Sequence, residues 1–145
     1  MNAYMNQYQN NQVLNASPEQ ILIMLYDGAI RFVNQADRAL ADGRMADKAK
    51  AISKAIAIIV EFSNTLDRAA GGEIAEDLSR LYDFMIRELT TANTSNDAER
   101  FKPVQKILAD LREAFSEAAI INRRKVQESQ VASNSSEQHH LAASC

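Results

Sequence analysis

An apolar helix-forming segment that begins at Ser17 constrains this chain more than any other feature. Ser17 is a favourable N-cap, Gln20 stands where it completes a capping box, and Pro18 occupies the first helical position. A core stripe follows at three- and four-residue spacing: Leu22, Leu25, Tyr26, Ala29 and Val33. Ile23 and Ile30 lie about a quarter-turn off that stripe. The helix therefore carries more apolar surface than one amphipathic face needs.

Composition places the chain among soluble globular proteins. Its 145 residues suffice for one domain with a real core, and a net charge of −3 argues against a nucleic-acid partner. The single cysteine, Cys145, excludes an intrachain disulfide and indicates a reducing compartment. The first residues lack the basic and apolar regions of a secretory signal, and the apolar run 55–60 is too short to span a membrane. We therefore expect a cytoplasmic protein without membrane insertion.

Four long helices are predicted over residues 18–41, 45–67, 73–92 and 97–122. The chain should break at Gly43, at the Gly71-Gly72 pair and around residues 93–96. Short connections make neighbouring helices antiparallel, so the expected fold is all-α, an antiparallel up-down-up-down four-helix bundle. Pro103 leaves two alternatives for the last helix, which either restarts there or begins at Asp97 with a local kink. The second alternative is favoured.

The two ends of the chain differ from the 17–122 domain. Residues 1–16 are rich in Asn and Gln yet contain Tyr4 and Tyr8, so a disordered tail and a mobile segment that docks on the domain both remain open. Residues 123–145 are rich in Ser, Gln, Asn and Glu, which predicts a disordered C-terminal tail. The bundle is therefore expected to have flexible tails at both its N- and C-terminal ends.

Residues suited to catalysis are missing from the domain. Residues 17–122 contain no His or Cys, no Glu-x-x-His pair and no glycine-rich phosphate loop. His139-His140 and Cys145 lie in a polar tail and are weak evidence for a metal site. Asp27 is explained by solvent exposure or by a helical pair with Arg31. We therefore expect no enzyme activity, no cofactor and no metal.

Apolar surplus remains once the core stripes are assigned. The off-stripe residues are Ile23, Ile30, Ile58, Val60, Phe62, Tyr82, Phe84 and Ile86. Some of these widen the core, and the others fit a groove for an amphipathic helix, a recurrent mode of peptide recognition.

Several short phrases resemble a known family in their order and spacing. They are Ala16-Ser17-Pro18, Leu25-Tyr26-Asp27-Gly28-Ala29, Lys54-Ala55-Ile56 with Ile58-Ile59, Gly71-Gly72-Glu73-Ile74-Ala75, Leu81-Tyr82-Asp83-Phe84-Met85, Ala92-Asn93 with Asn96-Asp97, and Leu111-Arg112-Glu113-Ala114-Phe115. Over about residues 4–124 the chain resembles the flagellin export chaperones of the FliS family. Tyr4 and Tyr8 also fall where that family tends to place tyrosines. Phe115 and Pro103 depart from it, since a Trp and an acidic residue are usual there.

The resemblance implies a non-enzymatic chaperone that holds the disordered C-terminal segment of flagellin in the cytosol. It also implies that the complex is delivered to the flagellar type III export gate, and that Tyr4 and Tyr8 form a displaceable plug over the substrate site. The residues expected to anchor flagellin in the groove are Ile23, Tyr26, Ile30, Ile58, Phe62 and Tyr82. Two alternatives stay open: a bundle that uses its apolar surplus for self-association, for example as a weak homodimer, and a small helical enzyme or cofactor carrier.

Overall fold

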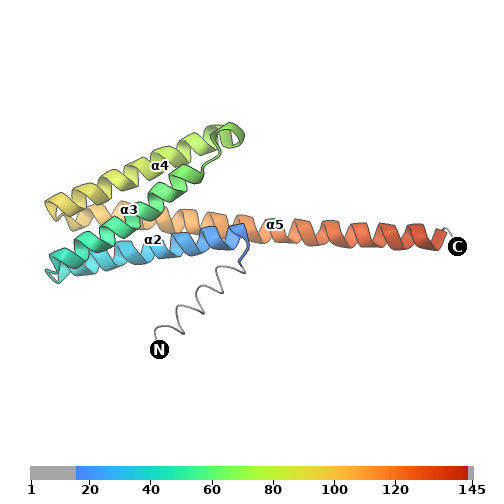
Figure 1. Cartoon of the computed structure of the whole chain (residues 1–145), viewed down its shortest axis with the longest axis horizontal. Coiled ribbons are helices and arrows are strands. Elements are labelled where there is room, and N and C mark those ends of the chain that lie inside the picture. The colour runs from blue at the N-terminus through green and yellow to red at the C-terminus, as the bar shows by residue number, and fades with distance from the viewer. Residues whose placement is uncertain (1–15, 144–145) are drawn as a thin grey trace, which may run out of the picture.

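Four α-helices make up the fold in the computed structural model, which describes the backbone of residues 16–143 and the side chains of residues 16–67 and 71–135. In chain order they are α2 (Pro18–Ala41), α3 (Met45–Thr65), α4 (Arg68–Ser95) and α5 (Phe101–Ala143), with a 3₁₀ turn η1 (Ala98–Arg100) before α5. Consecutive helices run antiparallel, and each packs against two neighbours in the ring order α2, α3, α4, α5 (Figure 1). The predicted all-α four-helix bundle is confirmed.

The start and end of α2 follow the local signals in the sequence. The Gln20 backbone N–H donates to the Ser17 hydroxyl over 3.2 Å, and the Ser17 N–H donates to the Gln20 side chain over 2.9 Å. The capping box is therefore complete. After Ala41 the chain turns at Gly43, whose φ of +75° is readily adopted only by glycine.

Glycine also breaks the chain before the main part of α4. Gly72 has φ +52° and ψ −126°, which is not helical, so the segment from residue 68 to 71 is a separate short turn. The predicted break at the glycine pair is confirmed.

The start of α5 differs from the favoured alternative. Asp97 does act as a cap, since its carboxylate accepts the Glu99 N–H over 3.1 Å, but it caps the 3₁₀ turn and not an α-helix. The α-helix proper begins at Phe101, which puts Pro103 in its first turn, where the backbone N–H groups have no partner within the helix. Pro103 therefore neither kinks α5 nor starts it.

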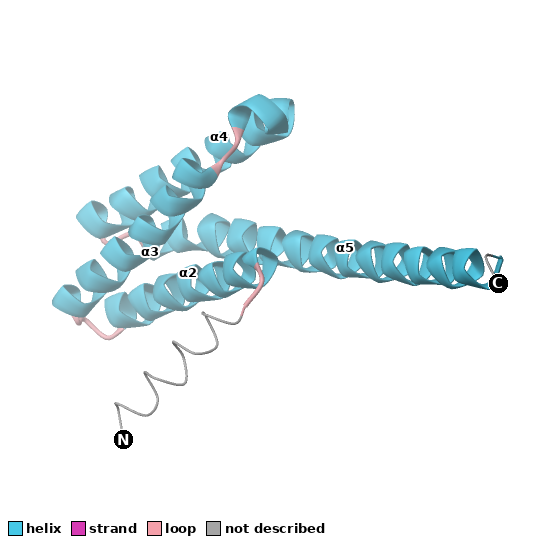
Figure 2. Cartoon of the chain, turned by 45° about the vertical axis from the view of Figure 1, so that its right-hand side comes forward, coloured by secondary structure: helices cyan, strands magenta, loops and turns pink. Residues whose placement is uncertain are grey.

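The end of α5 requires a correction to the boundary predicted at residue 122. The helix continues to Ala143, and its second half projects beyond the bundle, as Figure 2 shows from a second side. The disordered tail predicted for residues 123–145 is therefore wrong as far as Ala143, although every residue from 120 to 135 is exposed. The helix continues because no Gly or Pro follows Pro103 to end it.

Two polar contacts fix the helices relative to one another. The Lys48 side chain is only 4% exposed, and its ammonium donates to the Asn93 carbonyl over 2.9 Å and to the Asn96 side chain, at the C-terminal end of α4. Asp27 on α2 pairs with Arg112 on α5, 2.8 Å from Oδ1 to Nε. The partner of Asp27 is therefore Arg112 on another helix, and not Arg31 on its own helix as the sequence suggested.

None of the helices within residues 16–143 is both long enough and apolar enough to cross a membrane.

Candidate partner-binding surface

Three of the six predicted groove anchors lie in the core. Tyr26, Phe62 and Tyr82 are almost completely buried, with ring centroids 4.2 Å apart for the first pair and 5.6 Å for the second. The two tyrosine hydroxyls share a hydrogen bond of 2.7 Å, in which either can be the donor. Burial is the main cause that raises the pKa of both Tyr26 and Tyr82, so the pair stays neutral. In this conformation a partner cannot touch these side chains.

The other three predicted anchors are partly exposed but do not share one groove. Ile58 faces α2 at Gly28, where an added Cβ would lie 3.5 Å from its Cδ1. Ile23 and Ile30 flank Asp27 by one helical turn on each side, and Asp27 contacts α5. Ile58 is thus on the α3 side of α2, whereas Ile23 and Ile30 are on its α5 side. The structure does not gather the six anchors into a single surface.

Uncovered apolar side chains instead occur where α4 begins and where α5 leaves the bundle, and four of them define what we call the open end: Ile74, Leu78, Phe115 and Ile121. Going back along α4 from buried Tyr82, Leu78 is half-buried and Ile74 is 72% exposed, although all three lie on one helical face. On α5, Phe115 is half-buried and Ile121 is 53% exposed. Both views show the first turns of α4 standing away from α5 (Figures 1 and 2). The apolar face of α4 therefore extends beyond the part that α5 covers.

The aromatic residues of the core join this open end to the rest of the bundle. The Phe115 ring stacks on Tyr26 at 5.5 Å, and Tyr26 in turn stacks on Phe62. Ile74 was expected to point inward, and it does lie on the inward stripe of α4, but nothing covers it. Ile121 lies two residues after buried Ala119, about 200° round the helix, so its exposure follows from its position on α5.

Side chains for chemistry or metal binding are not gathered within the part of the chain that the structure describes. No group of three or more His, Cys, Asp or Glu residues there could hold a metal ion. His139, His140 and Cys145 fall outside the described side chains, as do Tyr4 and Tyr8, the predicted plug. What the described surface offers a partner is apolar contact and charge.

Comparison with known proteins places this bundle in a family. The family model for "Flagellar protein FliS" matches residues 1–123. The chain belongs to the FliS family. Among its relatives, the "Flagellar secretion chaperone FliS" of Salmonella typhimurium is 41% identical over 116 residues, which are 79% of this chain and 86% of the relative. The protein of the same name from Bacillus subtilis is 33% identical over 117 residues, 81% of this chain and 86% of the relative.

A solved structure shares the fold of this FliS chain. The "Crystal structure of flagellar chaperone from bacteria" aligns with a TM-score of 0.67 and covers 79% of this chain and 96% of that one, at 18% identity. The resemblance found in the sequence is therefore confirmed at the level of family and fold. Membership of the FliS family makes this chain a non-enzymatic secretion chaperone of the flagellar system, which needs an export substrate as a partner.

Proposed function

We propose that this chain is a cytosolic export chaperone for flagellin. It binds the disordered C-terminal segment of flagellin, prevents premature polymerisation and supports delivery to the export gate of the flagellar type III apparatus. The observation that carries the proposal is the FliS match over residues 1–123, together with relatives named flagellar secretion chaperones.

The open end supplies the contact surface for this role. Ile74 and Ile121 are large aliphatic side chains that the bundle leaves exposed, and Leu78 and Phe115 continue them into the core. A flagellin segment that folds into an amphipathic helix on this surface would extend the core stripe of α4 beyond the reach of α5. Ordering the segment costs free energy, so the net affinity is moderate and release at export remains possible.

The six residues that the sequence analysis predicted as groove anchors have two different roles in this proposal. Ile23, Ile30 and Ile58 keep some exposed surface and act as lateral contacts beside α2. Tyr26, Phe62 and Tyr82 form the buried support beneath Phe115 and do not touch flagellin directly.

Calorimetric titration with a peptide of the flagellin C-terminal segment tests the proposal. We expect saturable one-to-one binding with a negative heat-capacity change, because apolar surface is buried. A version lacking residues 1–16 should bind more tightly if Tyr4 and Tyr8 compete for the site as a plug. Absence of heat and of thermal stabilisation with both versions would overturn the flagellin-binding role.

A substitution at the open end locates the site. Ile74→Asp should weaken binding of the peptide at least about tenfold, which corresponds to about 1.4 kcal/mol. Because Ile74 is 72% exposed, the substitution should leave the fold intact. Met45→Asp is the matched control, since Met45 is also exposed but begins α3 at the opposite end of the bundle (Figure 1). If Ile74→Asp and Met45→Asp weakened binding of the peptide equally, the open end would not be the binding site.

Self-association is the second use that the exposed aliphatic side chains allow. Light scattering distinguishes it: a dimer that forms with rising concentration and does not respond to the flagellin peptide would favour a structural oligomer over a chaperone.

A further inference from the structure

Many of the described cations are paired with carboxylates, but a group of cations on α2 and α3 is not. Several cations form carboxylate pairs within 4 Å, at the pairs Arg44–Asp47, Arg80–Asp77, Arg100–Glu88, Lys102–Glu99, Lys106–Asp110 and Arg112–Asp27. Among the described side chains, no carboxylate pairs with Arg31, Arg38, Lys50 or Lys54, and these four lie together on α2 and α3. In a chain of net charge −3, such a group of unneutralised cations is unexpected.

A cleft between α2 and α3 brings these cations together. It has a volume of about 330 Å³, and Arg38, Lys50 and Lys54 line it. The buried alanines Ala39 and Ala51, one from each helix, also line it, and their short side chains leave the space between the helices open. Arg44 and Asp47 also line the cleft, and their charges offset each other because the two side chains form an ion pair. The cleft thus combines a shallow apolar floor with a cationic rim.

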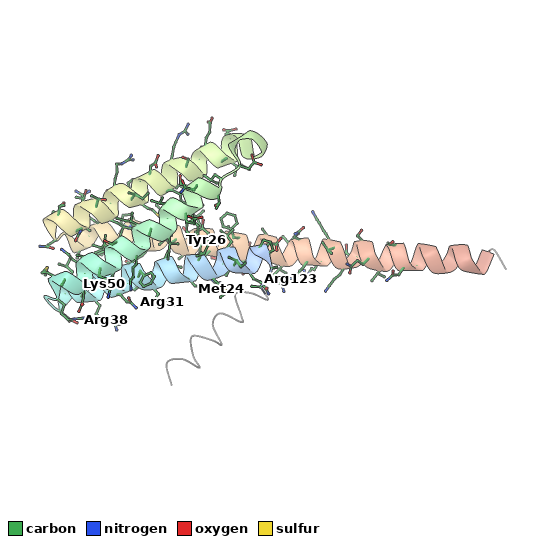
Figure 3. The ribbon with its side chains drawn as sticks, in the orientation of Figure 1. Met24, Tyr26, Arg31, Arg38, Lys50 and Arg123 are labelled. Carbon is green, nitrogen blue, oxygen red and sulfur yellow. The ribbon has the colours of Figure 1, made fainter. Side chains whose placement is uncertain are left out.

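Phe32 holds two of the cations near each other. The Arg31 guanidinium carbon lies 5.3 Å from the centroid of the Phe32 ring, and the Lys54 ammonium lies 5.4 Å from it. Cation–π attraction to one ring keeps both side chains at this position without neutralising their charge. Figure 3 shows Arg31, Arg38 and Lys50 on the half of the bundle near the α2–α3 turn, away from Arg123 on α5.

The spacing of the cations matches a helix. Arg31 and Arg38 are seven residues apart on α2, which corresponds to about two turns or roughly 10 Å. Because α3 runs antiparallel to α2, Lys54 lies beside the Arg31 end and Lys50 beside the Arg38 end. A helix lying along the cleft would present carboxylates at matching heights if Asp or Glu recurred at positions i and i+7 of one face.

We propose that this cleft, between Arg38 and Lys50 and extending to the Phe32 pair, is a second docking site that binds an acidic α-helical segment of a partner protein. Charge complementarity selects the acidic face, and the alanine floor accepts small apolar side chains between the carboxylates. A nucleic acid fits less well, because the net charge of the chain is negative and would repel the phosphates beyond the cleft. Arg38 and Lys50 lie near the α2–α3 turn, at the end of the bundle opposite the first turns of α4, so substitutions there and at Ile74 can be tested separately (Figure 3).

Fluorescence anisotropy with a designed peptide tests the proposal. The probe is a labelled alanine-rich helix with Glu at i, i+4 and i+7 of one face, and its control carries Gln at the same positions. We expect saturable binding of the Glu peptide to the full chain, at least about tenfold weaker binding of the Gln peptide, and marked weakening when salt rises from about 0.05 M to about 0.3 M. If the Glu peptide does not bind, the proposal is wrong.

Substitution of the cations assigns the binding to the cleft. Arg38→Gln combined with Lys50→Gln should weaken binding of the Glu peptide at least about tenfold. Lys102→Gln combined with Lys106→Gln is the matched control, because both lysines are exposed and already paired, and it should change binding less than about twofold. If the two double variants weakened binding of the Glu peptide equally, the effect would be due to the net charge of the chain and the proposed site would be wrong.

Two further outcomes would reassign the cleft. Stronger binding of a duplex oligonucleotide than of the Glu peptide, lost in the Arg38→Gln/Lys50→Gln variant, would make it a nucleic-acid site. Self-association that the same variant abolishes would assign it to a second copy of the chain. Ile74→Asp separates the two proposals, since it should weaken binding of the flagellin peptide and leave binding of the Glu peptide unchanged.

Discussion

The buried hydrogen bond between Tyr26 and Tyr82 predicts strong non-additivity. Replacing either tyrosine by Phe keeps the ring but leaves the other hydroxyl buried without its partner, which costs about 1–3 kcal/mol of the free energy of unfolding. Replacing both tyrosines removes both hydroxyls, so no buried polar group is left without a partner. The loss in the free energy of unfolding should then be only about 0.5 kcal/mol. The coupling between the two substitutions should therefore be about 1.5 kcal/mol or more.

Urea denaturation followed by far-ultraviolet circular dichroism measures this coupling in the wild-type chain, the two single variants and the double variant. The double variant is its own control, because it contains both ring replacements without an unpaired hydroxyl. If the double variant lost as much stability as the two single variants together, the hydroxyl pair would contribute nothing as a pair and the reasoning would be refuted.

Four further predictions concern the fold. Lys48→Met should lower the free energy of unfolding by about 1–3 kcal/mol, because the end of α4 loses a charged donor, whereas Lys50→Met should change it by less than about 0.5 kcal/mol in the same urea assay. Gly28→Ala should raise it by about 0.5–1 kcal/mol, because the position is mid-helix and the new Cβ meets only Ile58 at an ordinary contact distance, and an unchanged or lower denaturation midpoint would contradict this. Gly72→Ala should lower the melting temperature, at a cost of about 1–3 kcal/mol for a side chain at φ +52°; an unaltered melting temperature would show that this backbone relaxes. Because burial raises the pKa of both core tyrosines above 10.0, the folded state holds their protons more tightly than the unfolded state, so stability is complete below about pH 10 and falls as the pH rises beyond it. The double Tyr→Phe variant should lose this dependence in a pH series of urea titrations.

Local signals in the sequence were sufficient for the parts of the fold that depend on neighbours in the chain. The capping box at Ser17, the turn at Gly43 and the break at Gly72 each depend on residues within one helical turn, and the structure has all three. Pro103 was harder to place, because a proline is compatible with several positions in the first turn and only the 3₁₀ turn before Phe101 decides between them.

The candidate site could not be predicted from the pattern of any single helix, because it depends on how the helices pack. Ile74 lies on the inward stripe of α4, yet its exposure depends on where α5 passes, and that was not visible in the helix itself. The partner of Asp27 is Arg112, 85 residues away, whereas local spacing suggested Arg31. Tyr26 was placed on the core stripe of its helix and Tyr82 off the stripe of its own, yet both were expected to anchor flagellin. Tertiary packing instead buries both and gives each hydroxyl the other as its partner.

The stacked aromatic residues give the bundle a built-in optical reporter. Each helix contributes one ring, with Tyr26 from α2, Phe62 from α3, Tyr82 from α4 and Phe115 from α5. The chain contains no tryptophan, so the near-ultraviolet dichroism of the two buried tyrosines is not obscured. A ligand that moves α5 against α2 alters the stacking of Phe115 on Tyr26 and hence this spectrum. Rearrangement at the open end can thus be followed without an attached label.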